Sequence, residues 1–207
     1  METQEKELLL ISISELFMKF GIKSLTMDDI SRNLGISKKT LYQITTDKKD
    51  LVKQCIDLMI NMENNMLCEY QKINGNTIDE MLLINVHIGM KFQKIQPAVL
   101  FDLQKYFPEA WKEIENHKYC TILEVVKDNI EKGKSEGLYR ETINAEIVAK
   151  IYIGLVDKLF EPDFFLLAKK SFEELYIEIA GYHIRGIASD KGLKYLQKKL
   201  IDEKLNF

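Results

Sequence analysis

Apolar residues recur along this chain at the three- and four-residue spacing of α-helices. The first such segment, residues 3–20, carries one apolar stripe and ends at Gly21. A long segment runs from Lys48 toward Ile73, where the Asn-Gly-Asn at 74–76 interrupts it. Nothing in the pattern suggests strands, so it predicts an all-α protein. Further helices are predicted at 77–95, 98–106, 108–136, 144–160, 163–187 and 190–205.

The order of these helices predicts two domains. A small head of three helices, residues 1–47, comes first, and a larger helical body, residues 48–207, follows it. No low-complexity tract or flexible linker separates them. We therefore expect the long helix that begins at Lys48 to join the head to the body.

Residues 26–51 show the pattern of two short helices joined by a tight turn. Thr26 and Asp29 have the spacing of an N-terminal capping pair. Gly35 supplies the permissive backbone that ends the first helix, and Ser37 is placed to cap the second. Leu41 would point into a small core, which leaves the polar side chains of the second helix outside. The pattern predicts a helix-turn-helix, a unit that reads DNA.

The outward side chains match the chemistry of a DNA duplex. Lysine neutralises phosphate or donates to guanine, glutamine pairs with adenine, and the Thr and Tyr hydroxyls bind phosphate oxygens. From residue 32 to residue 53 there are six basic and two acidic residues, a balance of +4 in a chain of net charge −3. The expected DNA-binding residues are Thr26, Lys38, Lys39, Thr40, Tyr42, Gln43 and Lys48.

This stretch resembles the N-terminal pattern of the TetR family of transcription regulators. The matching features are the helix led by Thr26, Gly35-Ile36-Ser37, Thr40-Leu41-Tyr42, and Lys48 at the start of the next helix. The resemblance covers residues 5–55 in motif detail, and the rest matches in length and helical character. It implies a DNA-binding transcriptional regulator, a repressor that is released by a small-molecule effector bound in the C-terminal body.

One departure from the family pattern follows Tyr42. The family usually has an aromatic residue or His and then Phe, whereas this chain has Gln43-Ile44-Thr45. Thr45 in place of a buried aromatic predicts either a smaller core or a shifted helix. The departure would alter operator sequence and affinity without removing the phosphate-binding residues.

Large apolar and aromatic residues in the body predict a small-molecule cavity. The preferred wall is the segment 101–111, because Pro97 and Pro108 break the helices there. The same residues also fit an ordinary core, so both interpretations remain open. The candidate ligand-binding residues are Met62, Met66, Phe92, Phe101, Tyr106, Phe107 and Trp111.

Residues 145–160 and 171–187 have more apolar surface than one buried stripe needs. Gly154, Ala180 and Gly181 would allow close approach of a second chain. Two such helices from each subunit would form a homodimer, although both also fit the interior of the body. A twofold dimer would present its recognition helices to successive major grooves, roughly 34–36 Å apart, of a near-palindromic operator in double-stranded DNA.

Other classes of protein fit the sequence less well. No stretch approaches the roughly 18 apolar residues of a membrane span, and the N-terminus lacks a secretion signal, so we expect a cytoplasmic protein with no membrane partner. The cysteines at 55, 68 and 120 are odd in number and widely spaced, which indicates reduced core or near-core thiols. Gly133-Lys134-Ser135 lacks the first glycine of a P-loop, since Asp128 stands there.

The histidines lack the close partners of a metal site, and no nucleophile and base form a recognisable catalytic set. We therefore expect no enzyme, no cofactor and no metal. Two alternatives stay open: a helical enzyme or small-molecule-binding protein without specific DNA binding, and an interaction module that uses the head helices to bind a protein.

Overall fold

The structure is a computed structural model that describes residues 3–72, 75–94, 96–161 and 169–202. Within these ranges the regular structure is helical, apart from one isolated β-bridge between Tyr139 and Ala188. The predicted all-α fold is confirmed. The chain forms two compact units, of which the first comprises residues 1–66 with 94–117 and the second residues 67–93 with 118–207.

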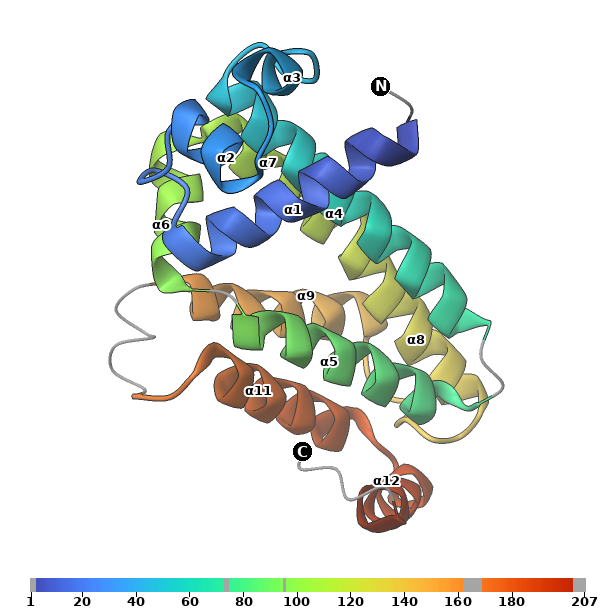
Figure 1. The fold of residues 1–207 in the computed structure, drawn as a ribbon. Coiled ribbons are helices and arrows are strands. Elements are labelled where there is room, and N and C mark those ends of the chain that lie inside the picture. Colours follow the sequence, from blue (N-terminus) through green and yellow to red (C-terminus); the bar gives the residue numbers. More distant parts are fainter. Residues whose placement is uncertain (1–2, 73–74, 95, 162–168, 203–207) are drawn as a thin grey trace. The chain divides into compact units, whose positions relative to one another are not determined.

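The first unit holds the predicted head together with two later helices. Its hydrophobic core includes Ile13, Leu41 and Leu51, which are fully buried, together with Val99 and Phe107 from the later helices. Those later helices therefore share one core with the helix-turn-helix, and the division at residue 47 stays a prediction. The elements, which Figure 1 labels, are α1 (Thr3–Phe20), α2 (Met27–Asn33), α3 (Lys38–Tyr42), most of α4 (Lys48–Gln71), α6 (Pro97–Tyr106) and α7 (Pro108–His117).

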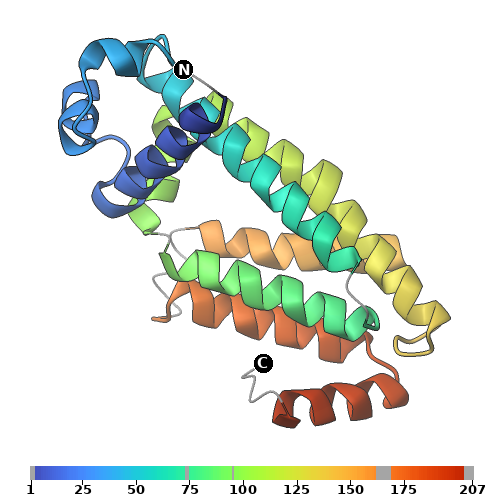
Figure 2. The same cartoon turned by 45° about the vertical axis from the view of Figure 1, so that its right-hand side comes forward.

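The second unit is a bundle in which α5, α9 and α11 lie side by side (Figures 1 and 2). Its core is built from apolar residues such as Ile78, Ile130, Ala149 and Ile184, which are fully buried. The elements are α5 (Thr77–Lys94), the π-helical turn η1 (Lys118–Ile122), α8 (Leu123–Ser135), α9 (Ala145–Asp157), the 3₁₀ turn η2 (Lys158–Phe160), α11 (Phe172–Ile187) and α12 (Asp190–Asp202).

Three predicted helices differ in detail from the structure. The segment 144–160 is α-helical to Asp157 and continues as the 3₁₀ turn η2. The segment 108–136 is interrupted by the π-helical turn, where Lys118 pairs with Asp157 and the hydroxyl of Tyr119 donates to the same carboxylate at 2.5 Å. The helix predicted from residue 163 begins at Phe172, because Ser171 caps it through a capping box with the carboxylate and N–H of Glu174. Residues 162–168 and 203–207 lie outside the described part.

The cysteines only partly match their prediction. Cys55 is buried, and burial raises the pKa of its thiol to about 11, so it stays protonated. Cys68 and Cys120 are exposed, which corrects the expectation of core or near-core thiols, because each occupies the outward side of its helix. None of the described helices is both long and apolar enough to cross a membrane.

Candidate nucleic-acid interface

Local capping builds the turn between α2 and α3. The hydroxyl oxygen of Thr26 accepts the backbone N–H of Asp29 at 3.1 Å, and the N–H of Thr26 donates to that carboxylate at 3.0 Å. Gly35 has a positive φ of 65°. The hydroxyl of Ser37 accepts the N–H of Thr40 at 3.0 Å. The predicted capping pair, the glycine turn and the second cap are all present.

Helix α3 is anchored by Leu41, Thr40 is half-buried, and the other side chains face outward. Leu41 is fully buried in the core of the first unit, whereas Lys38, Lys39, Tyr42 and Gln43 are exposed. The short helix therefore offers two ammonium groups, a phenol and an amide to a partner. These are groups that bind phosphates and base edges.

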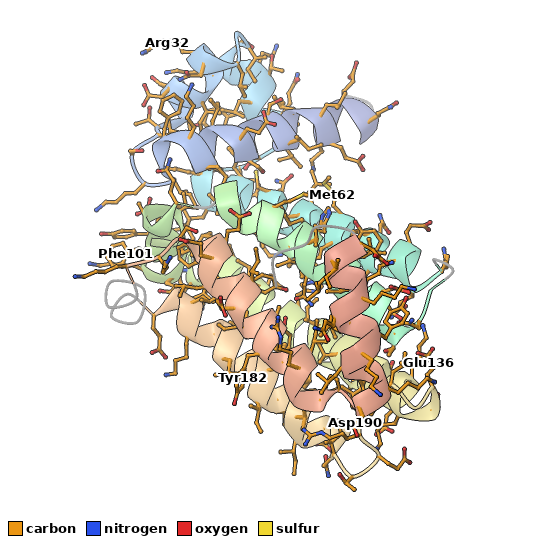
Figure 3. All side chains as sticks on the ribbon, turned by 90° about the horizontal axis from the view of Figure 1, so that it is seen from below. Arg32, Met62, Phe101, Glu136, Tyr182 and Asp190 are labelled. Atoms are coloured by element: carbon orange, nitrogen blue, oxygen red, sulfur yellow. The ribbon has the colours of Figure 1, made fainter. Side chains whose placement is uncertain are left out.

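Acidic side chains of α2 offset part of this positive charge. Lys38 pairs with Asp28 at 2.6 Å, and Arg32, which points outward in Figure 3, lies 3.7 Å from Asp29. Hydrogen bonds from Thr26 hold the pKa of Asp29 below its ordinary value. Exposed ion pairs contribute about 0–1 kcal/mol, so a DNA phosphate can readily replace the carboxylate beside Lys38.

Lys48 begins α4 and faces the loop that precedes α2. Its ammonium donates to the carbonyl of Lys23 at 3.2 Å and also to the carbonyl of Leu25. Partial burial lowers the pKa of Lys48, while the charges of Asp102 and Asp29 raise it. The ammonium therefore has partners within the chain, and its predicted phosphate contact stays a prediction.

At Gln43-Ile44-Thr45, where the family pattern has an aromatic residue, this chain forms hydrogen bonds through Thr45. The hydroxyl of Thr45 is buried and lies 2.7 Å from the carbonyl of Asp47 and 2.9 Å from the carboxylate of Asp50. The N–H of Thr46 donates to the same carboxylate at 2.8 Å, which lowers the pKa of Asp50. Ile44 is buried and supplies the apolar contact. The end of α3 is thereby fixed to the start of α4.

The aromatic residues of the predicted ligand wall have different surroundings. Phe107 is buried in the core of the first unit, and Tyr106 and Trp111 pack against that core. Phe101 is 47% exposed and points outward in Figure 3. Three of these four side chains therefore support the packing of α6 and α7, and their role as a ligand wall stays a prediction.

The other candidate ligand residues lie on α4 and α5. Met62 is 50% exposed and Met66 is half-buried. Phe92 lies in α5, and its side chain is outside the described part. The predicted set thus draws on both compact units, and the ligand site stays a prediction.

A surface groove of about 610 Å³ lies between α9 and α11 in the second unit. Ile151 and Tyr182 line it and are 57% and 73% exposed. His183, also part of the lining, is buried and stacks on Tyr152 with ring centroids 4.3 Å apart. Burial lowers the pKa of His183 to about 4, so the ring is neutral near pH 7. His183 therefore adds no charge to the groove, whose lining also includes Arg140, Glu178 and Arg185.

Of the small residues predicted to allow close approach of a second chain, Gly154 lies on an open surface, whereas Ala180 and Gly181 face the core. A Cβ added at Gly154 or at Gly186 would meet, among the described residues, no side chain and no backbone outside its own helix within 4 Å. Ala180 and Gly181 are buried inside the unit. They pack α11 against its own core, so on α11 the open position is Gly186, which corrects the predicted contact residues.

A buried polar cluster next to this groove joins three helices. The hydroxyls of Tyr152 on α9 and Tyr176 on α11 donate to the amide oxygen of Asn85 on α5, at 2.9 and 2.6 Å. Burial raises the pKa of Tyr152 to about 12, so it stays a donor. Sequence reasoning missed this cluster, although an amide within the apolar run at residues 81–88 was an available signal.

Asp102 on α6 is a second residue that sequence reasoning missed. Its carboxylate is buried and accepts the backbone N–H of Lys23 at 2.7 Å. Tyr106, one turn later on α6, accepts the ammonium of Lys23 at 2.8 Å. The available signal was an acid within the apolar run at residues 98–103. Through these contacts α6 holds the segment that leads into the helix-turn-helix.

Comparison with known proteins agrees with this geometry. Residues 9–55 match the model of the bacterial regulatory proteins of the tetR family. An uncharacterised HTH-type transcriptional regulator of Bacillus subtilis, YvaF, is 22% identical over 172 residues, which cover 81% of this chain and 88% of that protein.

Solved structures share the fold. A transcriptional regulator from Cytophaga hutchinsonii matches with a TM-score of 0.72 at 17% identity, over 89% of this chain and 99% of its own. A TetR-family regulator from Agrobacterium tumefaciens matches with a TM-score of 0.71 at 16% identity, over 91% and 100%. The matched segment spans the capped turn and the exposed α3 described above, so residues 9–55 form a helix-turn-helix segment of the TetR-family type.

Proposed function

We propose that this regulator is a homodimer that binds a near-palindromic operator, represses a nearby gene and is released by a small-molecule effector bound in its helical body. The observation that carries the proposal is α3, which presents Lys38, Lys39, Tyr42 and Gln43 outward while the buried Leu41 anchors it. A short, firmly held helix with cationic and amide groups is suited to a major groove.

The face of α9 and α11 supports the dimer. Ile147, Ile151 and Tyr182 are all more than half exposed there, around the groove of about 610 Å³. Burying one such side chain is worth roughly 1.5–3 kcal/mol. Gly154 and Gly186 leave room for a second backbone. A twofold contact through this face would link two heads and require an operator with matching symmetry.

Release by an effector requires that the ligand prefer one arrangement of the protein. A tenfold loss of DNA affinity needs about 1.4 kcal/mol of such preference. The polar cluster of Asn85, Tyr152 and Tyr176 supports a ligand role for the body, because hydroxyl and amide groups that converge in apolar surroundings orient ligands. The candidate wall from Phe101 to Trp111 remains part of the proposal.

The test of this function is selection of the purified protein on a pool of random duplexes, followed by a salt titration of the enriched sequence. We expect a palindrome whose affinity falls steeply with salt, because Lys and Arg release counterions from phosphates. Gln43→Ala should relax the preference at one base of each half-site, and Gln71→Ala, at an exposed glutamine of α4, should not. A folded protein that enriches no sequence would contradict the proposal.

A further inference from the structure

The loop between α1 and α2 is held by charged groups from two other helices of the same unit. From α6, the carboxylate of Asp102 accepts the N–H of Lys23 at 2.7 Å. From α4, the ammonium of Lys48 donates to the carbonyl of Lys23 at 3.2 Å and to that of Leu25. Leu25 directly precedes Thr26, which caps the first helix of the helix-turn-helix. These contacts therefore fix the point from which α2 starts.

Asp102 differs from a solvated surface acid. The residue is only 9% exposed, and its hydrogen bond to the loop is short and charge-assisted. The backbone runs close to it, because a Cβ added at Gly21 would lie 3.7 Å from its Oδ2. Tyr106 provides a second contact from α6. Its hydroxyl oxygen accepts a hydrogen bond from the ammonium of Lys23, which also lies 4.2 Å from the centre of the ring.

The charge of Asp102 and its hydrogen bond have opposite effects on DNA binding. A carboxylate repels phosphates, so removing one from the DNA-binding unit strengthens binding to every duplex. Without the hydrogen bond from Asp102, the loop would no longer hold the helix-turn-helix in its position. The bonds to base edges, which require exact placement, would then weaken more than the contacts to phosphates. The ratio of specific to non-specific affinity separates the two effects.

We propose that Asp102 is a positioning residue for DNA binding, whose carboxylate fixes the loop before α2 and so orients the helix-turn-helix toward its operator. Asp102 itself makes no contact with DNA in this scheme. The inference rests on the proposed function, because it presupposes sequence-specific duplex binding.

The test measures affinities of the full chain for the selected operator and for a scrambled duplex of equal length. In Asp102→Ala the ratio of the two should fall about tenfold, equal to about 1.4 kcal/mol, while affinity for the scrambled duplex stays equal or rises. Asp102→Asn keeps an acceptor oxygen and should show a smaller fall. Glu115→Gln, at an exposed acid of α7 in the same unit, should leave the ratio unchanged.

A reduced folded fraction lowers both affinities equally, so the ratio reports positioning rather than stability. If Asp102→Ala does not fold, Asp102→Asn decides the question by the same ratio. A ratio equal to that of Glu115→Gln in the folded Asp102 variants would overturn the inference and leave the proposed function standing. Wild-type protein that binds both duplexes alike would overturn the proposed function and the inference together.

Discussion

At the scale of single residues, the ion pair between Lys38 and Asp28 partly neutralises the positive charge on the exposed face of α3. The two groups are 2.6 Å apart, and both side chains are about half exposed. In water such a pair is weak, and a phosphate competes for the same ammonium. The carboxylate also repels the phosphate that would replace it. We therefore expect Asp28 to lower the affinity for DNA without affecting which sequence is preferred.

Asp28→Asn should raise operator affinity several-fold at low salt, because it frees Lys38 and removes a repelling charge. The gain should shrink toward 0.5 M salt, where charges are screened within a few ångströms. Fluorescence anisotropy at two salt concentrations measures both effects. Glu115→Gln removes one charge away from α3 and serves as the control. An equal gain in both variants would show that Lys38 is not restrained by Asp28.

At the scale of elements, Gly133 on α8 shows how one glycine fixes the packing of a turn. A Cβ added there would lie 2.1 Å from Cδ2 of Tyr139. The ring cannot move away easily, since Tyr139 is 2% exposed and its hydroxyl donates to Asn129 at 3.2 Å. The glycine that resembles part of a P-loop is therefore explained by close contact with an aromatic ring.

Gly133→Ala should destabilise the protein by about 1–3 kcal/mol, the usual cost of overpacking, although alanine favours helix more than glycine does. Urea unfolding followed by circular dichroism gives the change. Glu131→Ala, on an exposed residue of the same helix that pairs with Lys134 at 3.1 Å, should change stability by no more than about 0.5 kcal/mol. Stability of Gly133→Ala equal to wild type would mean that the Tyr139 ring yields.

Sequence predicted those elements whose signals are local. The caps at Thr26 and Ser37 and the turn at Gly35 depend on residues three or four positions apart, and each is present in the structure. The π-helical turn at Lys118–Ile122 has no proline or glycine to mark it, and it coincides with contacts to Asp157, which is far along the chain. Features that depend on such distant partners could not be predicted.

The same distinction applies to the candidate site. The outward residues of α3 follow from helical spacing around Leu41. Asp102 and Lys48 act through the backbone of Lys23, a contact that only the packing of α6 and α4 creates. The sequence therefore predicted the outward side chains and the local caps, but not the contacts that Asp102 and Lys48 make with the loop before α2.

At the scale of the whole molecule, the proposed dimer would determine how tightly DNA is held. In a dimer, binding of the first head to one half-site holds the second head near the other half-site, which raises the overall affinity. Separate chains would bind each half-site alone. The face formed by α9 and α11 is the surface on which this linkage would depend. Burial of its exposed apolar residues beneath a second chain would lower the free energy of the assembly.

Ile151→Glu places a charge at the centre of this face, where Ile151 is 57% exposed in the single chain and lines the groove. The folded chain should tolerate the exposed carboxylate, but a dimer would have to remove it from water and would lose the apolar contact of Ile151, and both changes disfavour association. We expect a monomer in analytical ultracentrifugation and at least a tenfold loss of operator affinity. Leu193→Glu, on an exposed leucine of α12, should leave the dimer intact. A dimer that survives Ile151→Glu would place the subunit contact elsewhere, and the operator would then have to be matched to a different spacing of the heads.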